Sequence, residues 1–296
     1  MQASEILQLI VAGITVGAVY ALVAVGFTII YSATGIINFA QGEFVILGGL
    51  LFYTLYVTAK LPLVLALLLA VAAVAVLGWL MERLTIRPLR AAPVVTLIIV
   101  TVGVSVVLRG AAKLIWGPSA LPVPAFSGDR SIFIAGAALH LQYLWVLGLT
   151  AIAVVGVRLF FDYTLVGKAM QACAIDMDAA RLVGISVSRM TQASFALSAA
   201  LSALAGAVIS PITFASDDGG MVLGLKGFCG AIIGGLGNAP GAVVGGLLVG
   251  LLENLGVGIM PEGYSGYQNA FAFVLLLIVL FLRPSGFFGA RRTEGL

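Results

Sequence analysis

The sequence predicts an all-α polytopic membrane protein with about eight transmembrane or re-entrant helices. Three observations predict this class: 61% of the residues are hydrophobic, only 9% are charged, and the mean hydropathy is +1.18. A soluble domain carries about 25% charged residues, so a chain this apolar needs lipid as its solvent. Its apolar stretches are about 20 residues long, which fits helices rather than the roughly 10-residue strands of a membrane barrel.

The first apolar stretch, residues 6–31, is too long for a cleaved signal peptide and lacks a basic leader, so it is expected to remain as a spanning helix. A turn at residues 32–35 separates it from the second stretch. Loops that contain Pro, Gly or charged residues bound the later ones. The remaining expected segments cover residues 36–57, 63–81, 94–114, 141–161, 191–212, 221–255 and 267–282.

Glycine-rich runs interrupt two of these segments. The run at 234–241 divides the segment 221–255, so two short helices are expected to meet there. The glycine-interrupted stretches around 32–50 and 230–254 fit the discontinuous helices that transporters use at substrate sites. All of these segments are assigned to one transmembrane domain, residues 1–296, and residues 117–139 form its longest outer loop.

The basic residues indicate an orientation. With the N-terminus outside, ten of the fifteen lie in cytoplasmic loops, and they are Arg83, Arg87, Arg90, Arg158, Lys168, Arg181, Arg189, Arg283, Arg291 and Arg292. The other five, Lys60, Arg109, Lys113, Arg130 and Lys226, lie outside or near the outer face. Because cytoplasmic loops carry an excess of Lys and Arg, we expect a multi-pass inner-membrane protein with a periplasmic N-terminus and a cytoplasmic C-terminus.

The polar segment 162–190 is the expected cytoplasmic coupling loop. Within residues 167–185, an acidic residue and two alanines are followed after three residues by a glycine, which fits the coupling helix of ABC importers. Small residues let a short helix enter a groove on a partner, and the glycine turns the chain back toward the membrane. The alternative is an ordinary connector helix. The assigned residues are Gly167, Ala172, Asp176, Asp178, Ala179, Ala180 and Gly184.

Four landmarks together resemble the LivH-type permeases of branched-chain amino acid ABC importers. They are the run GIINFAQGEF at 35–44, the loop at 167–185, the run GGLGNAPGA at 234–242, and RPSGFFG at 283–289. They occur in the family's order and cover nearly the whole chain. One departure is that no Ile-x-Leu-Pro follows Gly184, which leaves the exact boundary of the coupling helix open.

This resemblance implies one of two permease subunits that form a pathway for branched-chain or related amino acids. The implied partners are a second, related permease, two cytoplasmic ATPases, a periplasmic substrate-binding protein and the lipid bilayer. The family also includes permeases for urea and short amides, which is the alternative substrate class. The chain has no G-x₄-G-K-[ST] phosphate loop, so it is not expected to be an enzyme, and ATP hydrolysis belongs to partner subunits. No cofactor, metal ion or nucleic acid is expected.

Five residues in the glycine-rich runs are expected to line the translocation path or to form a structural motif: Asn38, Gln41, Glu43, Gly235 and Asn238. Glu43 lies in an apolar segment, where a carboxylate is by default functional. It also stands near a helix start, where it can act as a cap that the helix dipole favours, and the cap or another structural role is preferred. Arg109 is expected to extend its charged group toward the outer surface.

Two other classes of function compete with the permease. A stand-alone secondary transporter or channel would use intramembrane charge pairs for ion coupling, and Glu43 and Glu253 are the few candidates. An intramembrane enzyme would need paired catalytic groups within its spans, and the sequence offers no such pair.

Overall fold

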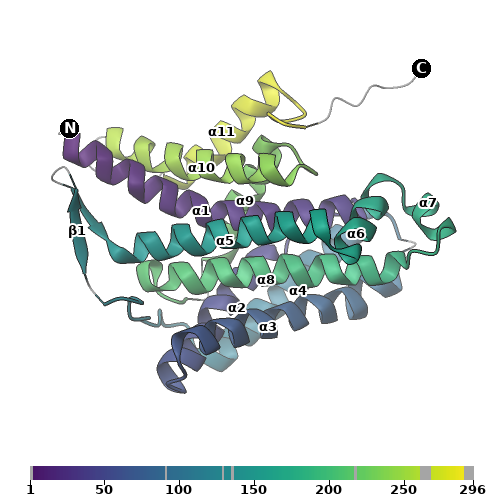
Figure 1. Cartoon of the computed structure of the whole chain (residues 1–296), viewed down its shortest axis with the longest axis horizontal. Coiled ribbons are helices and arrows are strands. Elements are labelled where there is room, and N and C mark those ends of the chain that lie inside the picture. Colours follow the sequence, from purple (N-terminus) through teal and green to yellow (C-terminus); the bar gives the residue numbers. More distant parts are fainter. Residues whose placement is uncertain are drawn as a thin grey trace.

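The computed structural model describes residues 3–90, 92–128, 130–134, 137–216, 219–260 and 268–289 (Figure 1). Its α-helices are α1 (Ala3–Thr34), α2 (Gln41–Tyr53), α3 (Leu63–Met81), α4 (Val94–Trp116), α5 (Leu141–Tyr163), α6 (Leu165–Ile175), α7 (Met177–Leu182), α8 (Val187–Thr213), α9 (Gly220–Gly234), α10 (Ala239–Ile259) and α11 (Gln268–Leu282). Thr54–Thr58 and Glu82–Ile86 are π-helical turns, and Arg87–Leu89 is a 3₁₀ turn. The strands β1 (Ser131–Ile134) and β2 (Ala137–His140) pair antiparallel, with Ser131 opposite His140.

Six helices in the described part of the chain are long and apolar enough to cross a membrane, which confirms the all-α polytopic class. They are α1, α3 with the turns that follow it, α4, α5, α8 and α10. The expected segment 36–57 is shorter than a full span because residues 36–40 are not helical and α2 begins only at Gln41. The expected segment 221–255 divides into α9 and α10, and the last one becomes the 15-residue α11.

The helices α1 and α8 form the centre of the bundle, and about two thirds of the residues in the apolar window of each are buried. They run in opposite directions (Figure 1). The helices α2 and α3 pack on α8, whereas α9 and α10 pack on α1. The arrangement of α1–α4 therefore recurs in α8–α11 with the opposite orientation, which is an inverted repeat of the kind found in many transporters. No repeat was evident in the amino-acid sequence.

The first residues of α2 and α9 meet inside the bundle. A side chain on Gly42 would collide with the carbonyl oxygen of Gly220, so glycine is needed for this approach. The discontinuous helices are therefore α2 and α9, each preceded by described residues that are not helical, at 36–40 and at 214–216. The predicted break within 230–254 is present as well, because α9 ends at Gly234 and α10 begins at Ala239. Residues 234–241 form a tight turn there, in which Gly235 and Gly237 have φ of +101° and +94°.

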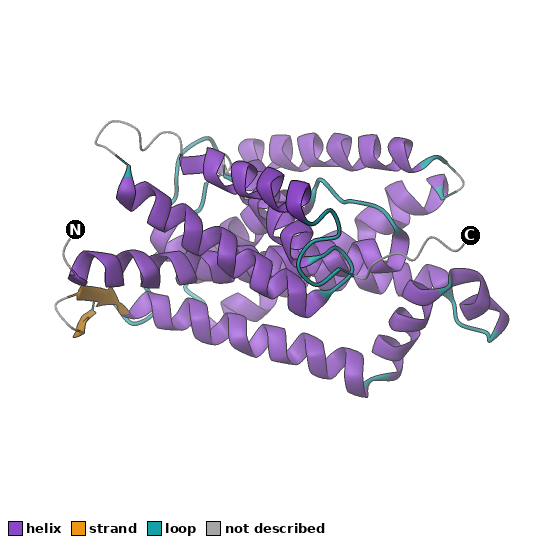
Figure 2. Ribbon diagram, turned by 90° about the horizontal axis from the view of Figure 1, so that it is seen from above, coloured by secondary structure: helices purple, strands orange, loops and turns teal. Residues whose placement is uncertain are grey.

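The bundle has two ends, which we call the α7 end and the hairpin end. The α7 end carries α6, α7 and the turn at 234–241, and the hairpin end carries the start of α1 and the β1–β2 hairpin (Figure 2). The hairpin lies within the expected outer loop 117–139 except for its last residue, His140. Residues 285–289 contact the turn at 234–241, so α1 begins at one end and the described chain finishes at the other. A chain that starts at one end of the bundle and finishes at the other must cross it an odd number of times. Eight complete crossings would bring it back to the end where it started.

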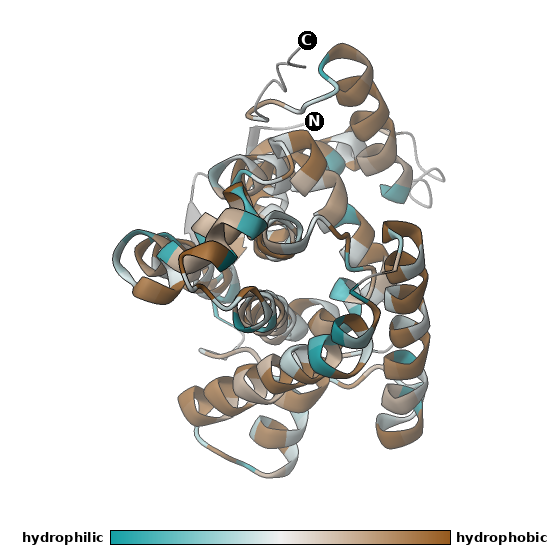
Figure 3. Ribbon diagram, turned by 90° about the vertical axis from the view of Figure 1, so that its right-hand side faces the viewer, coloured by the Kyte–Doolittle hydropathy of each residue, from teal (hydrophilic) through white to brown (hydrophobic). Residues whose placement is uncertain are grey.

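The basic residues expected in the cytoplasm belong to elements at the α7 end, apart from Arg291 and Arg292, which lie outside the described residues. Asp217, Asp218 and most of the expected loop 256–266 are also outside them. Peripheral helices are coloured mainly hydrophobic in Figure 3, and α3, α4, α5 and α11 carry many exposed large apolar side chains, as lipid contact requires.

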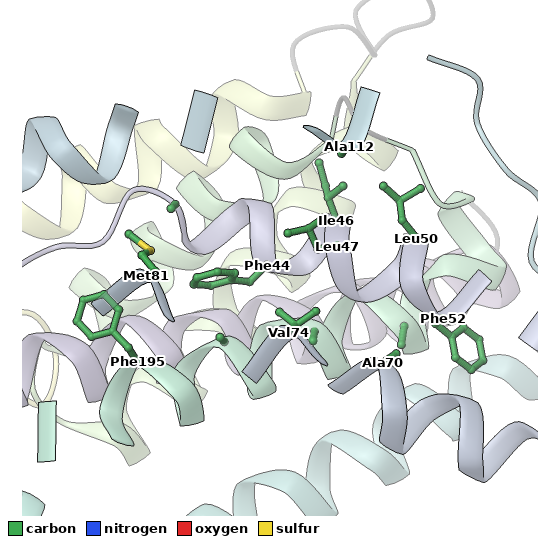
Figure 4. Close-up of a cluster of buried hydrophobic side chains, with 14 of the residues drawn as sticks. Phe44, Ile46, Leu47, Leu50, Phe52, Ala70, Val74, Met81, Ala112 and Phe195 are labelled. Carbon is green, nitrogen blue, oxygen red and sulfur yellow. The ribbon is translucent and has the colours of Figure 1, made fainter. Parts of the chain in front are cut away.

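A buried apolar cluster holds α2 between α3 and α8. Figure 4 shows Phe44 and Leu47 of α2 facing this core, with Val74 of α3 and Phe195 of α8 around them. The cluster fixes the position of the first turn of α2, which carries Gln41 and Glu43.

Candidate functional site

The coupling segment forms two helices rather than the single helix that the sequence suggested. Asp176 interrupts it, because its extended backbone (φ −153°, ψ 112°) ends α6 and begins α7. Its carboxylate accepts hydrogen bonds from the backbone N–H groups of Asp178 (2.8 Å) and Ala179 (3.0 Å). This is an N-cap, which satisfies donors that a helix start leaves open. Ala172 contributes its carbonyl oxygen to the N–H of Asp176, at 3.1 Å.

The helix α7 ends in a Schellman turn at Gly184, which has a φ of +85°. The N–H of Gly184 donates to the carbonyl of Arg181, and the N–H of Ile185 donates to the carbonyl of Ala180, both at 3.0 Å. Glycine is the preferred residue at this left-handed position because it has no Cβ to clash. The turn directs the chain from α7 into α8, as the sequence predicted.

One side of α7 is anchored and the other is free. Ala180 is buried against Cys173 and Val187, and burial raises the pKa of the Cys173 thiol although the Arg181 charge opposes this. In contrast, Leu182 is 89% exposed and Val183 is 76% exposed. Ala179 is exposed as well, and Asp178 pairs with Arg181 at 2.7 Å. The result is a short helix that presents apolar side chains at the polar end of the bundle.

Gly167 has a different position from the other coupling residues. It is buried in the first turn of α6, where a side chain would collide with the carbonyl oxygen of Phe160. Its N–H donates to the hydroxyl of Thr164, the N-cap of α6, at 2.9 Å. Gly167 therefore allows the sharp bend between α5 and α6.

Asn38 and Gln41 are fully buried at the start of α2. The amide oxygen of Asn38 accepts from the N–H of Ala40 at 3.0 Å. The amide nitrogen of Gln41 donates to the hydroxyls of Ser198 and Ser202, both at 2.7 Å, and so joins α2 to α8. The second polar atom of each amide has no partner among the described residues.

Glu43 forms an ion pair and makes no capping hydrogen bond, so the cap is not formed, whereas a structural role remains the expectation. Its carboxylate lies 2.5 Å from a guanidinium nitrogen of Arg109 and 2.9 Å from the hydroxyl of Ser105, both on α4. No side-chain cap bond forms at the start of α2. The expectation that Arg109 extends to the surface was wrong, because the carboxylate holds it inside the bundle. Thr101, one turn before Ser105, accepts from the N–H of Phe39 at 3.1 Å.

Gly235 and Asn238 form the turn between α9 and α10. Asn238 is the N-cap of α10, since its amide oxygen accepts from the N–H of Gly241 at 2.8 Å. Its amide nitrogen donates to the carbonyl of Phe288 at 3.1 Å. The N–H groups of Phe287 and Phe288 bond to α9, so the RPSGFFG motif packs on this turn. Two of the four sequence landmarks therefore meet at the α7 end.

A second buried ion pair was missed in the sequence. Lys226 of α9, expected near the outer face, is only 5% exposed and contacts the Glu253 carboxylate at 2.7 Å. Tyr20 (3.2 Å) and Gln268 (2.8 Å) also donate to this carboxylate. The available signal was an isolated lysine and an isolated glutamate inside neighbouring apolar segments, which is rare unless the two pair.

The candidate residues thus fall into two groups. The coupling residues, Gly235 and Asn238 gather at the α7 end, whereas Asn38, Gln41 and Glu43 lie inside the bundle. The interior group makes helix-to-helix contacts through its described bonds. The α7 group combines a rigidly held short helix with an exposed apolar face.

Comparisons with known proteins agree with one another. The family described as "Branched-chain amino acid transport system / permease component" matches residues 9–280. The chain is 32% identical to the high-affinity branched-chain amino acid transport system permease protein BraD of Pseudomonas aeruginosa, over 97% of both chains. It is 30% identical to LivH of Escherichia coli strain K12, again over 97% of both. The probable LivH of Methanocaldococcus jannaschii is 26% identical, over 90% of this chain and 88% of its own. No solved structure matches.

Proposed function

The chain belongs to the branched-chain amino acid transport permease family, and we propose that it is one permease subunit of an ABC importer. With a second, related permease it forms the pathway for branched-chain or related amino acids across the inner membrane. A periplasmic binding protein delivers the substrate, and two cytoplasmic ATPases drive the transport. The chain needs no cofactor of its own, and ATP is used by the ATPases.

The exposed face of α7 is the observation that carries this proposal. Leu182 is the last residue of α7 and Val183 is its C-cap, and both are exposed apolar side chains at the α7 end of the bundle. Together with Ile175, which is 88% exposed at the end of α6, they give this end of the bundle a group of exposed apolar side chains, which favours a contact with another protein. Because α7 is capped at both ends, a force on it passes through Ala180 to α6 and α8 rather than unwinding the helix. A partner docked here therefore biases the membrane helices between two states.

The basic residues support a cytoplasmic α7 end. Arg83, Arg87 and Arg90 precede α4, and Lys168 and Arg189 flank α7. The positive-inside rule assigns such an end to the cytoplasm. The N-terminus then faces the periplasm, and the hairpin end meets the binding protein.

The interior ion pairs are relevant to the alternative function, a stand-alone transporter. Such a transporter would use intramembrane charge pairs for ion coupling, and the sequence offered few charged residues for that role. The described residues include two such pairs inside the bundle, Glu43–Arg109 and Lys226–Glu253. Each carboxylate already has a cation and a hydrogen-bond donor from this chain. These closed pairs fit a role in joining helices better than a role in carrying an ion.

Copurification tests the assembly. The tagged chain, extracted in mild detergent, is expected to bring down two copies of ATPase and one related permease. A competition series then tests the substrate class: unlabelled isoleucine and valine should inhibit leucine uptake, and urea should not. Inhibition by urea alone would move the assignment to the urea and short-amide permeases.

A further inference from the structure

A cavity of about 920 Å³ opens between α1, α5, α6 and the start of α10. Ligand pockets span about 300–1,000 Å³, so the cavity holds a ligand of amino-acid size with water beside it. It lies at the α7 end, next to the coupling segment. We infer that it is the inner binding site from which an α-amino acid with an apolar side chain is released. This inference rests on the proposed function and adds the site and the contacts.

An unpartnered hydroxyl lies beside the cavity wall. Thr28 of α1 lines the cavity and is 2% exposed, yet its hydroxyl has no hydrogen-bond partner among the described residues. Two other threonines of α1, Thr15 and Thr34, donate to the carbonyl four residues earlier, at 2.8 and 2.7 Å. Thr28 does not make this bond. A buried polar group without a partner is costly. The oxygen exposes almost no surface in this conformation, and a rotation of the side chain toward the cavity would let a ligand atom or water remove that cost.

Charges of both signs lie at the cavity's rim. Arg158 and Asp162, one turn apart near the end of α5, both line it. Their closest N–O distance is 3.6 Å, which is longer than a hydrogen bond, and their side chains are 82% and 45% exposed. Such a pair contributes little to stability. It can therefore exchange its partner for the carboxylate and ammonium groups of a free amino acid at little cost.

The rest of the lining suits an apolar side chain. Val25 and Ile29 of α1, Val157 of α5 and Met170 of α6 are among the apolar side chains of the wall. Two charges at the mouth and an apolar interior match a zwitterion with a branched aliphatic side chain. Urea, which has neither a charge nor an apolar part, gains little from this arrangement.

The same cavity connects the site to the coupling helix. Met170, Gln171 and Ala174 of α6 form one wall, and α6 leads through Asp176 directly into α7. Any displacement of α7 by an ATPase therefore moves this wall. The cavity narrows or widens with the ATPase cycle, so substrate release is linked mechanically to the movement of the ATPases.

Substrate protection of an introduced thiol tests the inference. Ala174→Cys places a thiol on the cavity wall, and Leu165→Cys places one on the same helix outside the cavity, where Leu165 is 90% exposed. The native thiols, Cys173 and Cys229, are buried, and the unmodified chain measures their background. The complex is assayed in inside-out vesicles with a maleimide, with and without leucine. Leucine should slow labelling at position 174 and leave position 165 unchanged.

The chemistry of the ligand is tested in the same assay. Urea and N-acetyl-leucine amide, which lacks both charges, should protect position 174 weakly. Thr28→Val should raise the leucine concentration for half-protection about three- to ten-fold, the effect of one lost hydrogen bond. Thr150→Val is the matched control, because Thr150 is also buried without a partner for its hydroxyl but does not line the cavity.

The outcomes separate the two claims. If the complex takes up leucine but leucine does not protect position 174, the cavity is not the inner site and the proposed function stands. Equal effects of Thr28→Val and Thr150→Val would also overturn the inference. If the complex takes up no apolar amino acid, the proposed function fails, and the inference fails with it.

Discussion

The carboxylate of Glu43 on α2 lies 2.5 Å from a guanidinium nitrogen of Arg109 on α4. Most of the apolar window of α4 is exposed, so the helix has few buried side chains to hold it in place. Thr101, Ser105 and Arg109 lie one turn apart on a single face of α4, and all three bond to the region around the start of α2. This polar face attaches a peripheral helix to the centre of the bundle.

Glu43→Gln should therefore destabilise the protein. Removing one partner of a buried pair costs about 3–5 kcal/mol, and about 2–3 kcal/mol is expected here because the Arg109 side chain is 31% exposed. Denaturant unfolding in detergent measures the change. The double variant Glu43→Gln/Arg109→Gln should recover much of the loss, since it leaves no uncompensated charge. A single variant as stable as the parent, or abolished uptake in a fully assembled complex, would instead assign Glu43 to transport.

Gly184→Val should uncouple ATP hydrolysis from uptake while the protein still inserts. No atom lies within 4 Å of a Cβ at this position, so its φ of +85° is the constraint. A β-branched residue is strongly disfavoured there and would distort the Schellman turn. Gly184→Asn is the matched control, because Asn tolerates the left-handed region. Vesicle assays of ATPase activity and uptake should separate the two variants; full coupling in the assembled Val variant would contradict the assignment.

Leu182→Ser combined with Val183→Ser should weaken binding of the ATPases. Both side chains are largely exposed, so the fold should keep its stability within about 0.5 kcal/mol. Leu165→Ser is the control, because Leu165 is equally exposed but lies at the start of α6. Pull-down of the ATPases by the tagged chain gives the readout. Equal recovery with the double variant would mean that the ATPases dock elsewhere.

The orientation is testable with two serines. Ser119 lies in the loop at the hairpin end, and Ser186 lies at the start of α8 at the α7 end; both are exposed. A membrane-impermeant maleimide should label Ser119→Cys in intact spheroplasts and Ser186→Cys only after lysis. The opposite pattern would invert the topology.

The membrane class and most helix boundaries could be predicted because a long apolar run has the length that a helix needs to span the bilayer. The start of α2 could not, since residues 36–40 are as apolar as a helix although the chain is not helical there. The break in the coupling segment at Asp176 had a signal, because Asp is a favoured N-cap, but small helix-forming residues on both sides concealed it.

The interior contacts were less predictable. Glu43 and Arg109 are 66 residues apart, and nothing local indicates that α2 and α4 are neighbours. Lys226 and Glu253 pair across the turn at 234–241, which sequence reasoning had treated as a discontinuous helix. The inverted repeat was also hidden, because it is conserved in packing, with α2 on α8 and α9 on α1, rather than in residue identity.

ATP-dependent leucine uptake tests the central claim most directly. The chain is reconstituted in proteoliposomes with the permease, ATPases and binding protein that copurify with it, and labelled leucine is added on the side of the binding protein. Uptake should require ATP, the binding protein and this chain together. Leucine uptake by this chain alone, driven by an ion gradient and unaffected by ATP, would contradict the account.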